Sequence, residues 1–306
     1  MTSPDLQSEL STLTTEAFRP ELAEIDQLPT AEIARLMNAE DQSVPAAVAG
    51  ELPRIAAAID AVAERMARGG RLIYAGAGTA GRLGVLDASE CPPTFNADPS
   101  QVVGLIAGGP TALTAAVEGA EDSSSLAVHD LSAIGLTADD TVVGVSASGR
   151  TPYALGAVEY ARSVGALTVG LACNRDSALG AAADHRVEVV VGPEFLTGST
   201  RLKAGTAQKL VLNMISTITM IRLGKTYGNL MVDVRATNDK LRARSRRIVA
   251  LATGAPEDRI EAALTATGGE VKDAILTLLA GVDAPTAAAL LAKADGHLRK
   301  ALTLPD

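Results

Sequence analysis

The sequence has very few aromatic residues: tryptophan is absent, and four tyrosines and three phenylalanines make up 2% of the 306 residues. Proteins that hold single-stranded nucleic acid stack its bases on aromatic side chains, so the composition argues against that class. The net charge of −9 also argues against a partner with a phosphate backbone. Because 47% of the residues are apolar, the chain can still bury a core, built mainly from alanine, valine, leucine and isoleucine.

Cysteine and histidine are also scarce. The two cysteines lack the close spacing of a metal site, and the three histidines are scattered along the chain: Cys91, Cys173, His129, His185 and His297. We therefore expect reduced thiols and structural or surface histidines rather than a zinc site or a catalytic triad.

The sequence also lacks a long apolar run. The longest, residues 210–221, contains Asn213, Ser216 and Thr217, and it is too short to cross a bilayer. The first residues do not form the basic and apolar stretch of a secretion signal. The sequence therefore predicts a soluble, cytoplasmic protein.

What the sequence does contain is an alternation of apolar runs and helical patterns. The apolar runs are continuous, as in strands buried on both faces of a parallel sheet. The alternation predicts an α/β fold with a doubly wound, parallel five-stranded sheet. The expected strands are Arg71–Ala75, Val102–Ala107, Thr141–Ser146, Leu167–Ala172 and Val187–Val191, and the expected helices between them are Arg82–Ser89, Thr111–Glu118 and Pro152–Val164.

Helical segments are expected before and after the sheet domain in the sequence. Residues 1–43 predict an N-terminal helical arm with a short helix at Thr30–Met37. Residues 44–238 form the predicted sheet domain, which opens with a long helix that ends before Gly69 and Gly70. Residues 239–306 predict a small all-helical module. The basic run from Arg242 to Arg247 in this module predicts a solvated face or an interface.

Two of the expected strands run into loops of small residues. The first strand is followed by Gly76, Gly78 and Gly81, and the third by Ser-Ala-Ser-Gly-Arg-Thr at residues 146–151. Glycine lets the backbone approach a ligand closely, and the free N–H groups that open a helix face an anion. Because ligands of such sheets lie beyond the carboxyl ends of the strands, the two loops together predict a site for one phosphorylated ligand.

The first loop alone has two other interpretations. Gly76, Gly78 and Gly81 also fit the dinucleotide fingerprint G-x-G-x-x-G, which requires an acidic residue at the end of the next strand. The next apolar run, Val102–Ala107, ends in two glycines without a carboxylate. Ordinary tight turns of an α/β sheet are the remaining alternative, which the hydroxyl-rich second loop makes less favourable.

A third polar segment, residues 192–206, opens a long helix that is expected to run through Ile221. It contains Glu194, Ser199 and Lys203, whose polar and charged groups would add to the same pocket. The alternative is a capped helix whose basic residues face solvent.

Two glutamates are candidates for proton transfer. Glu90 is expected at the end of the first site helix, partly shielded from water by Cys91, Pro92 and Pro93, and shielding favours a protonated carboxyl. Glu121 lies in a polar run after the second strand and its expected helix. Either one alone could be an ordinary surface glutamate. As a pair beside a phosphate pocket, they suit proton abstraction next to a carbonyl and protonation of a leaving oxygen.

Six segments together resemble the N-acetylmuramic acid 6-phosphate etherase family. They are Gly76–Gly84, Leu86–Phe95, Val117–Asp122, Ser146–Tyr153, Gly198–Thr206 and Asn229–Val234, and the resemblance extends over nearly the whole chain. It implies a flavodoxin-like sugar isomerase (SIS) domain and a C-terminal module similar to a ubiquitin-associated fold. It also implies cleavage of the lactyl ether of N-acetylmuramic acid 6-phosphate by water, which yields N-acetylglucosamine 6-phosphate and D-lactate in cell-wall sugar recycling.

The resemblance further implies a homodimer with its pocket at the subunit interface, a bacterial cytoplasm and no cofactor. It places the two catalytic glutamates at Glu90 and Glu121. The expected substrate-binding residues are Gly78, Thr79, Ser146, Ser148, Thr151, Glu194, Ser199 and Lys203.

One residue departs from the family pattern: Ala80 stands where the family commonly has serine, and Thr79 is the nearest replacement for that hydroxyl. Two other functions share the fold and the loops. An aldose–ketose phosphosugar isomerase would retain the substituent on C3, and a non-catalytic phosphosugar sensor similar to the glucokinase regulatory protein would bind without turnover. The glutamate pair favours the etherase.

Overall fold

The structure is a computed structural model that describes residues 13–233 and 239–304. The chain forms two compact units. Unit 1 consists of residues 1–89 and 100–216, and unit 2 consists of residues 90–99 and 217–306. The expected boundary at residue 238, Val234 of the last family motif and the first twelve residues of the expected arm all lie outside the described residues. The division into arm, sheet domain and helical module remains a prediction.

Unit 1 is organised around one sheet of β1 (Leu72–Gly76), β2 (Val102–Ile106), β3 (Thr141–Ser146), β4 (Leu167–Ala172) and β5 (His185–Glu188). The strand order is β2-β1-β3-β4-β5, and every neighbouring pair is parallel. All residues of β1, β3 and β4 are buried, which explains their continuous apolar runs. The doubly wound α/β prediction is confirmed. The last strand differs, since β5 ends three residues earlier than expected.

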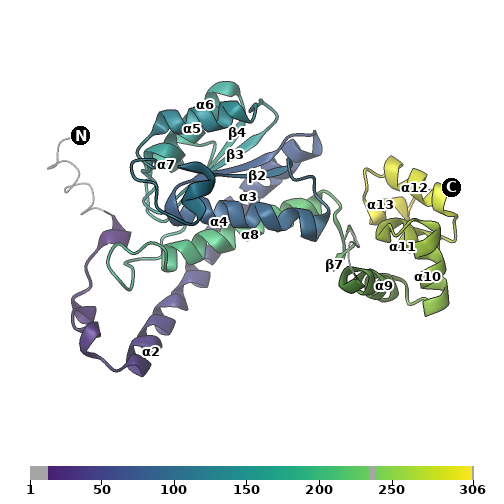
Figure 1. The fold of residues 1–306 in the computed structure, drawn as a ribbon, viewed down its shortest axis with the longest axis horizontal. Coiled ribbons are helices and arrows are strands. Elements are labelled where there is room, and N and C mark those ends of the chain that lie inside the picture. The colour runs from purple at the N-terminus through teal and green to yellow at the C-terminus, as the bar shows by residue number, and fades with distance from the viewer. Residues whose placement is uncertain (1–12, 234–238, 305–306) are drawn as a thin grey trace. The chain divides into compact units, whose positions relative to one another are not determined.

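Helices cover both faces of the sheet (Figure 1). On one face, the helices pack on Ile73 and Val142 through Tyr153, Ala157 and Leu131. This face carries α5 (Ser124–Ala133), α6 (Pro152–Val164) and α7 (Ala178–Ala182), and the other carries α3 (Ser43–Ala67) with the unit 1 parts of α4 (Gly78–Phe95) and α8 (Lys203–Arg222).

The expected helix at Thr111–Glu118 is wrong. A short 3-10 helix, η4 (Gly109–Leu113), takes part of its place, and α5 follows only at Ser124. Gly119 has a left-handed φ of 72°, which a continuing helix does not allow. The Ser123 hydroxyl then accepts the Leu126 N–H at 3.1 Å and so caps the start of α5.

Helix α4 extends beyond the expected Arg82–Ser89 in both directions. It includes Pro92 and Pro93 near its C-terminal end, where the missing proline N–H groups cannot donate to the carbonyls of Ala88 and Ser89, four residues earlier. Glu90 therefore lies within the helix, so its expected position at the helix end is wrong.

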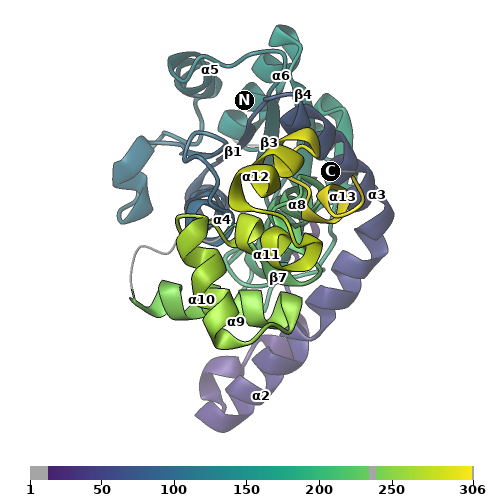
Figure 2. The same cartoon turned by 90° about the vertical axis from the view of Figure 1, so that its right-hand side faces the viewer.

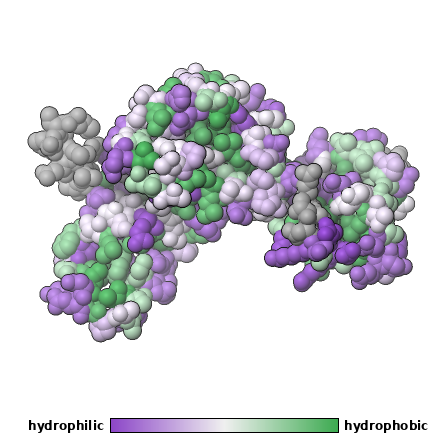
Figure 3. All heavy atoms as spheres, viewed as in Figure 1, coloured by the Kyte–Doolittle hydropathy of each residue, from purple (hydrophilic) through white to green (hydrophobic). Residues whose placement is uncertain are grey.

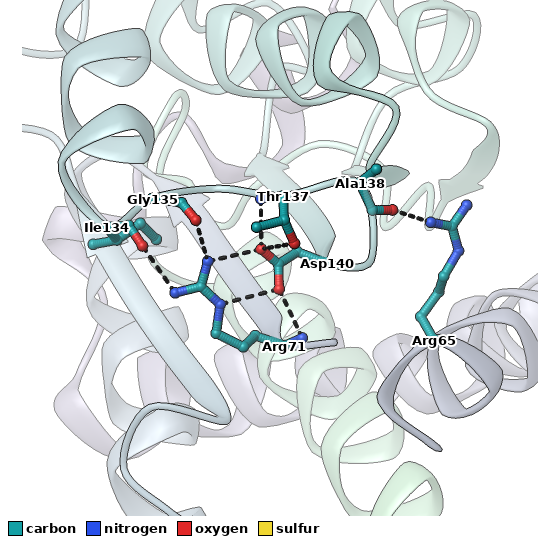
Figure 4. Close-up of polar contacts among 7 residues, drawn as sticks. All are labelled: Arg65, Arg71, Ile134, Gly135, Thr137, Ala138 and Asp140. Carbon is teal, nitrogen blue, oxygen red and sulfur yellow. Dashed lines mark hydrogen bonds and ion pairs between the residues drawn. The ribbon is translucent and has the colours of Figure 1, made fainter. Parts of the chain in front are cut away.

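Asp140 and Arg71 fasten the amino-terminal edge of the sheet (Figure 4). Asp140 is only 2% exposed and accepts hydrogen bonds from the backbone N–H, Nε and Nη2 of Arg71 and from the N–H and hydroxyl of Thr137. Arg71 also donates to the carbonyls of Ile134 and Gly135. Burial alone would raise the pKa of the Asp140 carboxyl, but the Arg71 guanidinium and the Thr137 N–H hold this pKa below its usual range.

The N-terminal segment of unit 1 is held by ion pairs. Glu40 accepts Nζ of Lys203 at 2.9 Å and Nη1 of Arg19 at 2.7 Å. Although burial alone would raise the pKa of the Glu40 carboxyl, these two cations keep it below its usual range. The elements of this segment are η1 (Thr14–Glu16), η2 (Pro20–Leu22), η3 (Ile25–Gln27) and α2 (Thr30–Asp41).

Apolar side chains of this segment remain exposed. Helix α2 has no buried residue, and its Ile33, Leu36 and Met37 are only partly covered. Phe18 is 66% exposed. Figure 3 shows the resulting apolar surface over α2. We call Phe18, Ile33, Leu36 and Met37 the arm surface.

Unit 2 is a helical bundle with its own core (Figure 2). Ile248, Ile275 and Leu290 belong to one buried apolar cluster. The three expected short helices are present, and a fourth follows them. The elements are β6 (Thr226–Tyr227), β7 (Leu230–Met231), α9 (Asp239–Thr253), α10 (Glu257–Ala266), α11 (Val271–Ala280), α12 (Ala284–Lys293) and α13 (Leu298–Ala301).

Within the described residues, no single helix has both the length and the apolar character needed to span a membrane. Of the helices in the described part of the chain, only α11 and α12 taken together reach that length and hydropathy, and they are bent by 105° at their junction.

Candidate active site

Three hydroxyls cluster in the loop that follows β3. Ser146 Oγ lies 2.8 Å from Thr151 Oγ1 and 3.2 Å from Ser148 Oγ. Ser146 is 2% exposed, whereas Ser148 and Thr151 are half-buried. The loop therefore presents Ser148 and Thr151 outward, with Ser146 beneath them.

The backbone of this loop depends on Gly149. Its φ is 71°, and an added Cβ would lie 2.4 Å from Cβ of Ser177. Its N–H donates to Ser146 Oγ at 3.0 Å, which closes the turn. Helix α6 begins directly after the loop at Pro152, so its positive end adds to the attraction for an anion.

Glu121 lies next to this loop. Its carbonyl accepts the N–H of Tyr153, in the first turn of α6, at 3.0 Å. Its carboxylate is exposed and makes no hydrogen bond or ion pair with the described residues. The structure thus brings Glu121 together with the hydroxyl loop. The element before Glu121 is the short 3-10 helix η4 and not the expected helix Thr111–Glu118.

The glycines of the first loop serve packing more than ligand contact. Gly81 must lack a side chain because a Cβ there would lie 2.6 Å from the Gly76 carbonyl oxygen. Gly78 has a φ of 53° and begins α4, and the space around its missing side chain is open. Ala80 is 7% exposed, so the position where the family commonly has serine is buried.

Thr79 lies beside the start of α8. An added Cβ on Gly205 would meet the Thr79 methyl carbon at 3.4 Å. The openings of α4 and α8 therefore approach each other at this point, as expected if segment 192–206 contributes to the same pocket.

Glu194 and Lys203 have structural partners in this segment. The Glu194 side chain is fully buried, and its oxygens accept the N–H groups of Lys203 and Ala204, both at 2.9 Å, which caps α8. Burial raises the pKa of the Glu194 carboxyl above its usual range, and the two N–H donors partly oppose this shift. Lys203 is 3% exposed and directs Nζ to Glu40. Ser199 is half-buried, with its N–H bonded to the Leu196 carbonyl.

Glu90 is not shielded as expected. Its side chain is exposed on α4, and Pro92 and Pro93 leave it open to solvent. From Gly78 to Glu90 the helix advances twelve residues, or about 18 Å at about 1.5 Å per residue. The structure therefore groups Glu121 with the hydroxyl loop in unit 1, whereas Glu90 belongs to unit 2.

Within unit 2, Glu90 lines a cavity of about 410 Å³. Its other lining residues are Pro92, Pro93, Thr94, Asn96, Ala97, Pro99, Met231, Leu241 and Arg244. The volume lies in the range of small-molecule sites in proteins.

Sequence reasoning did not assign a role to Asp87, three residues before Glu90. Its carboxylate is 6% exposed and accepts hydrogen bonds from the Tyr74 hydroxyl at 2.8 Å, the Asn213 amide at 2.6 Å and the Ser216 hydroxyl at 3.1 Å. These contacts fix α4 against β1 and α8. Its partners on α8 lie 126 and 129 residues away, so no local sequence pattern reveals them.

Among the residues that the structure describes, no group of three or more histidine, cysteine or acidic side chains is arranged to hold a metal ion. The strand next to β1 ends in Ile106, and Ala107, Gly108 and Gly109 follow. The dinucleotide interpretation therefore finds no ribose-binding carboxylate at this strand end.

Comparison with known proteins identifies the family. The model of the glucokinase regulatory protein N-terminal SIS domain matches residues 54–162, and the SIS domain model matches residues 117–218. An N-acetylmuramic acid 6-phosphate etherase of Streptomyces avermitilis is 81% identical over 97% of this chain and 96% of that protein. Those of Streptomyces coelicolor and Rubrobacter xylanophilus are 82% and 61% identical, over 98% and 97% of this chain and 96% and 98% of theirs.

The chain belongs to the N-acetylmuramic acid 6-phosphate etherase family. The etherase likeness extends over nearly the full length, whereas the regulatory-protein model covers only part of the sheet domain. A solved phosphoheptose isomerase from Francisella tularensis matches with a TM-score of 0.47 and 18% identity over 62% of this chain and 97% of that chain, which is too weak to support a conclusion.

Proposed function

We propose that this etherase family member cleaves the D-lactyl ether of N-acetylmuramic acid 6-phosphate, giving N-acetylglucosamine 6-phosphate and D-lactate. The observation that carries the proposal is the 81% identity to a curated etherase over nearly the full length of both chains. We place the reaction in the cytoplasm, as a step of cell-wall amino-sugar recycling.

The chemistry requires two proton transfers, one from C2 and one to the ether oxygen on the neighbouring carbon, C3. Opening of the sugar ring exposes an aldehyde at C1, which acidifies the proton on C2. Loss of that proton expels the lactyl oxygen from C3, and water then adds to C3 of the unsaturated aldehyde. The reaction needs a base at C2, an acid at the ether oxygen and fixed contacts to the phosphate.

We assign the base to Glu121 and the phosphate contacts to Ser148 and Thr151. This assignment is supported by the exposure of Glu121 and by the hydrogen bond of its carbonyl to the N–H of Tyr153, two residues after Thr151. Ser146, Thr79, Gly78 and Ser199 shape or line the same end of the sheet in this proposal. Lys203 and Glu194 have a supporting role in this proposal, because Lys203 already pairs with Glu40 and Glu194 already accepts the N–H groups at the start of α8.

We assign the acid to Glu90, and we propose that it acts in the site of a second copy of the chain. Glu90 lies about 18 Å along α4 from Gly78, farther than a hexose phosphate reaches. The arm surface offers apolar area for an isologous dimer. Mixing folded Glu90→Gln and Glu121→Gln proteins tests this arrangement: hybrid dimers regain one intact site if the site is shared, and mixing restores nothing if each chain forms its own site.

The activity itself is tested by measuring D-lactate released from N-acetylmuramic acid 6-phosphate without added metal or nucleotide. An aldose–ketose isomerase would leave the lactyl ether intact, and a sensor would bind the sugar phosphate without turnover. Unphosphorylated N-acetylmuramic acid should be a very poor substrate. Equal turnover of the two sugars would mean that the hydroxyl loops do not bind phosphate.

A further inference from the structure

Helix α9 carries four arginines, and the structure gives them different surroundings. Arg242 pairs with Asp239, and Arg246 directs Nε to Glu261 at 2.7 Å. Arg244 and Arg247 are exposed and form no ion pair within the described part of the chain. Arg244 differs from Arg247 in lining the cavity that also contains Glu90.

The charge distribution in this cavity is simple. Of its described lining residues, Glu90 is the only acid and Arg244 the only base. The other lining residues are uncharged. Thr94 and Asn96 have polar side chains, and the rest, including Met231 and Leu241, are apolar. A small organic anion that enters the cavity therefore meets one unpaired guanidinium and one carboxyl group.

The leaving group of the proposed reaction is such an anion. The lactyl carboxylate is attached to the carbon that carries the ether oxygen, so it arrives with that oxygen wherever Glu90 acts. Two carboxyl groups close together disfavour each other's ionised form unless a cation compensates. Guanidinium groups bind carboxylates with two parallel hydrogen bonds, which also fixes their orientation.

We propose that Arg244 binds the lactyl carboxylate and thereby selects the ether that Glu90 protonates. This inference rests on the proposed function and adds a residue that determines which C3 substituent is accepted. Glu90 and Arg244, the acid and the base that line the cavity, lie 154 residues apart in the sequence. The basic run of α9 thus has one member with a binding role among neighbours that are paired or solvated.

The experiment compares two substrates and three variants. The substrates are N-acetylmuramic acid 6-phosphate and its analogue in which the lactyl carboxylate is a primary amide. The variants are Arg244→Gln, Arg244→Lys and the control Arg247→Gln, which removes a charge that is also exposed but does not line the cavity. Release of D-lactate or D-lactamide gives kcat/KM, and thermal unfolding checks that each variant is folded.

Arg244→Gln should lower kcat/KM for the acid by about 10- to 100-fold, the range for a lost hydrogen bond to a charged group. It should change kcat/KM for the amide by less than about threefold, so that the preference for the acid disappears. Arg244→Lys should keep part of the preference, because lysine retains the charge without the paired geometry. Arg247→Gln should leave both values unchanged.

A wild-type protein that cleaves both substrates equally well would overturn the inference. So would an Arg244→Gln protein that loses the same factor on both, since that pattern indicates a structural role. If the wild-type protein releases neither product, the proposed function fails instead, and the two failures are thereby distinguished.

Discussion

The two edges of the sheet in unit 1 differ in how completely their polar groups are satisfied. At the amino-terminal edge, Asp140 is buried and accepts five hydrogen bonds from Arg71 and Thr137 (Figure 4). At the carboxyl-terminal edge, Ser148 and Thr151 are half-buried, and the exposed Glu121 carboxylate has no hydrogen bond or ion pair with the described residues. The first arrangement stabilises the fold, and the second leaves hydrogen-bonding capacity for a ligand.

This comparison predicts that changes at one edge alter stability and changes at the other alter turnover. The largest expected effect belongs to the two glutamates. Glu90→Gln and Glu121→Gln should each lower the rate of lactate release by about 10²- to 10⁴-fold, because they keep the shape of the side chain but remove proton transfer. Both carboxylates are exposed, so the unfolding midpoints should not change.

A partial reaction separates the two glutamates. In heavy water, Glu90→Gln should still exchange the C2 proton of the product sugar phosphate, whereas Glu121→Gln should not. The opposite pattern, observed by NMR, would reverse the two assignments. Full lactate release by both variants would remove these residues from the mechanism.

At the amino-terminal edge, Asp140→Ala should lower the free energy of unfolding by about 3 kcal/mol, because it leaves the Arg71 guanidinium without its carboxylate. We use the lower end of the range of destabilisation for breaking a buried ion pair, because the Arg71 side chain remains 22% exposed. Asp139→Ala, at the exposed neighbouring position, is the matched control and should change little. Urea denaturation measures both. A large loss of kcat in folded Asp140→Ala at low temperature would contradict the separation of the two edges.

Within the hydroxyl loop, Ser148→Ala should raise KM for the phosphorylated substrate by about 10- to 100-fold. It should lower stability less than Ser146→Ala, because the Ser148 hydroxyl is only half-buried and its hydrogen bond from the Arg150 N–H is 3.2 Å long. Ser146→Ala should in addition lower the free energy of unfolding by about 1 kcal/mol, since the buried Ser146 hydroxyl accepts the Gly149 N–H. Equal stability losses for the two variants would mean that Ser148 is as structural as Ser146. Steady-state kinetics and urea denaturation give the two quantities.

The smallest expected effect is on the acid side of the stability profile. The pKa of Asp140 is lower in the folded protein than in the unfolded chain, so its stabilising contribution is complete above the ordinary aspartate pKa of about 4. That contribution is lost as the pH falls through the folded-state pKa. Denaturation measured from pH 6 to pH 3 should therefore show a shallower loss in Asp140→Ala than in the wild-type protein. An unchanged slope would mean that Asp140 does not contribute to acid unfolding.

The sequence by itself determined the class of fold, and it predicts which edge of the sheet binds the ligand. A strand buried on both faces must be apolar throughout, so β1, β3 and β4 are visible as continuous runs, and β3 and β4 have the expected bounds. Glycines and small hydroxyl residues after β1 and β3 are equally local signals. The six family motifs identified the etherase relationship that the comparisons confirm.

Only the tertiary structure decided which charged groups are occupied and which are open. It pairs Lys203 with Glu40, 163 residues away, and uses Glu194 to cap α8. It leaves Glu90 exposed on a helix that continues through Pro92 and Pro93, and it places Arg244 in the same cavity. These contacts join residues that are far apart in the chain, and their strength depends on burial and distance, which sequence spacing does not encode.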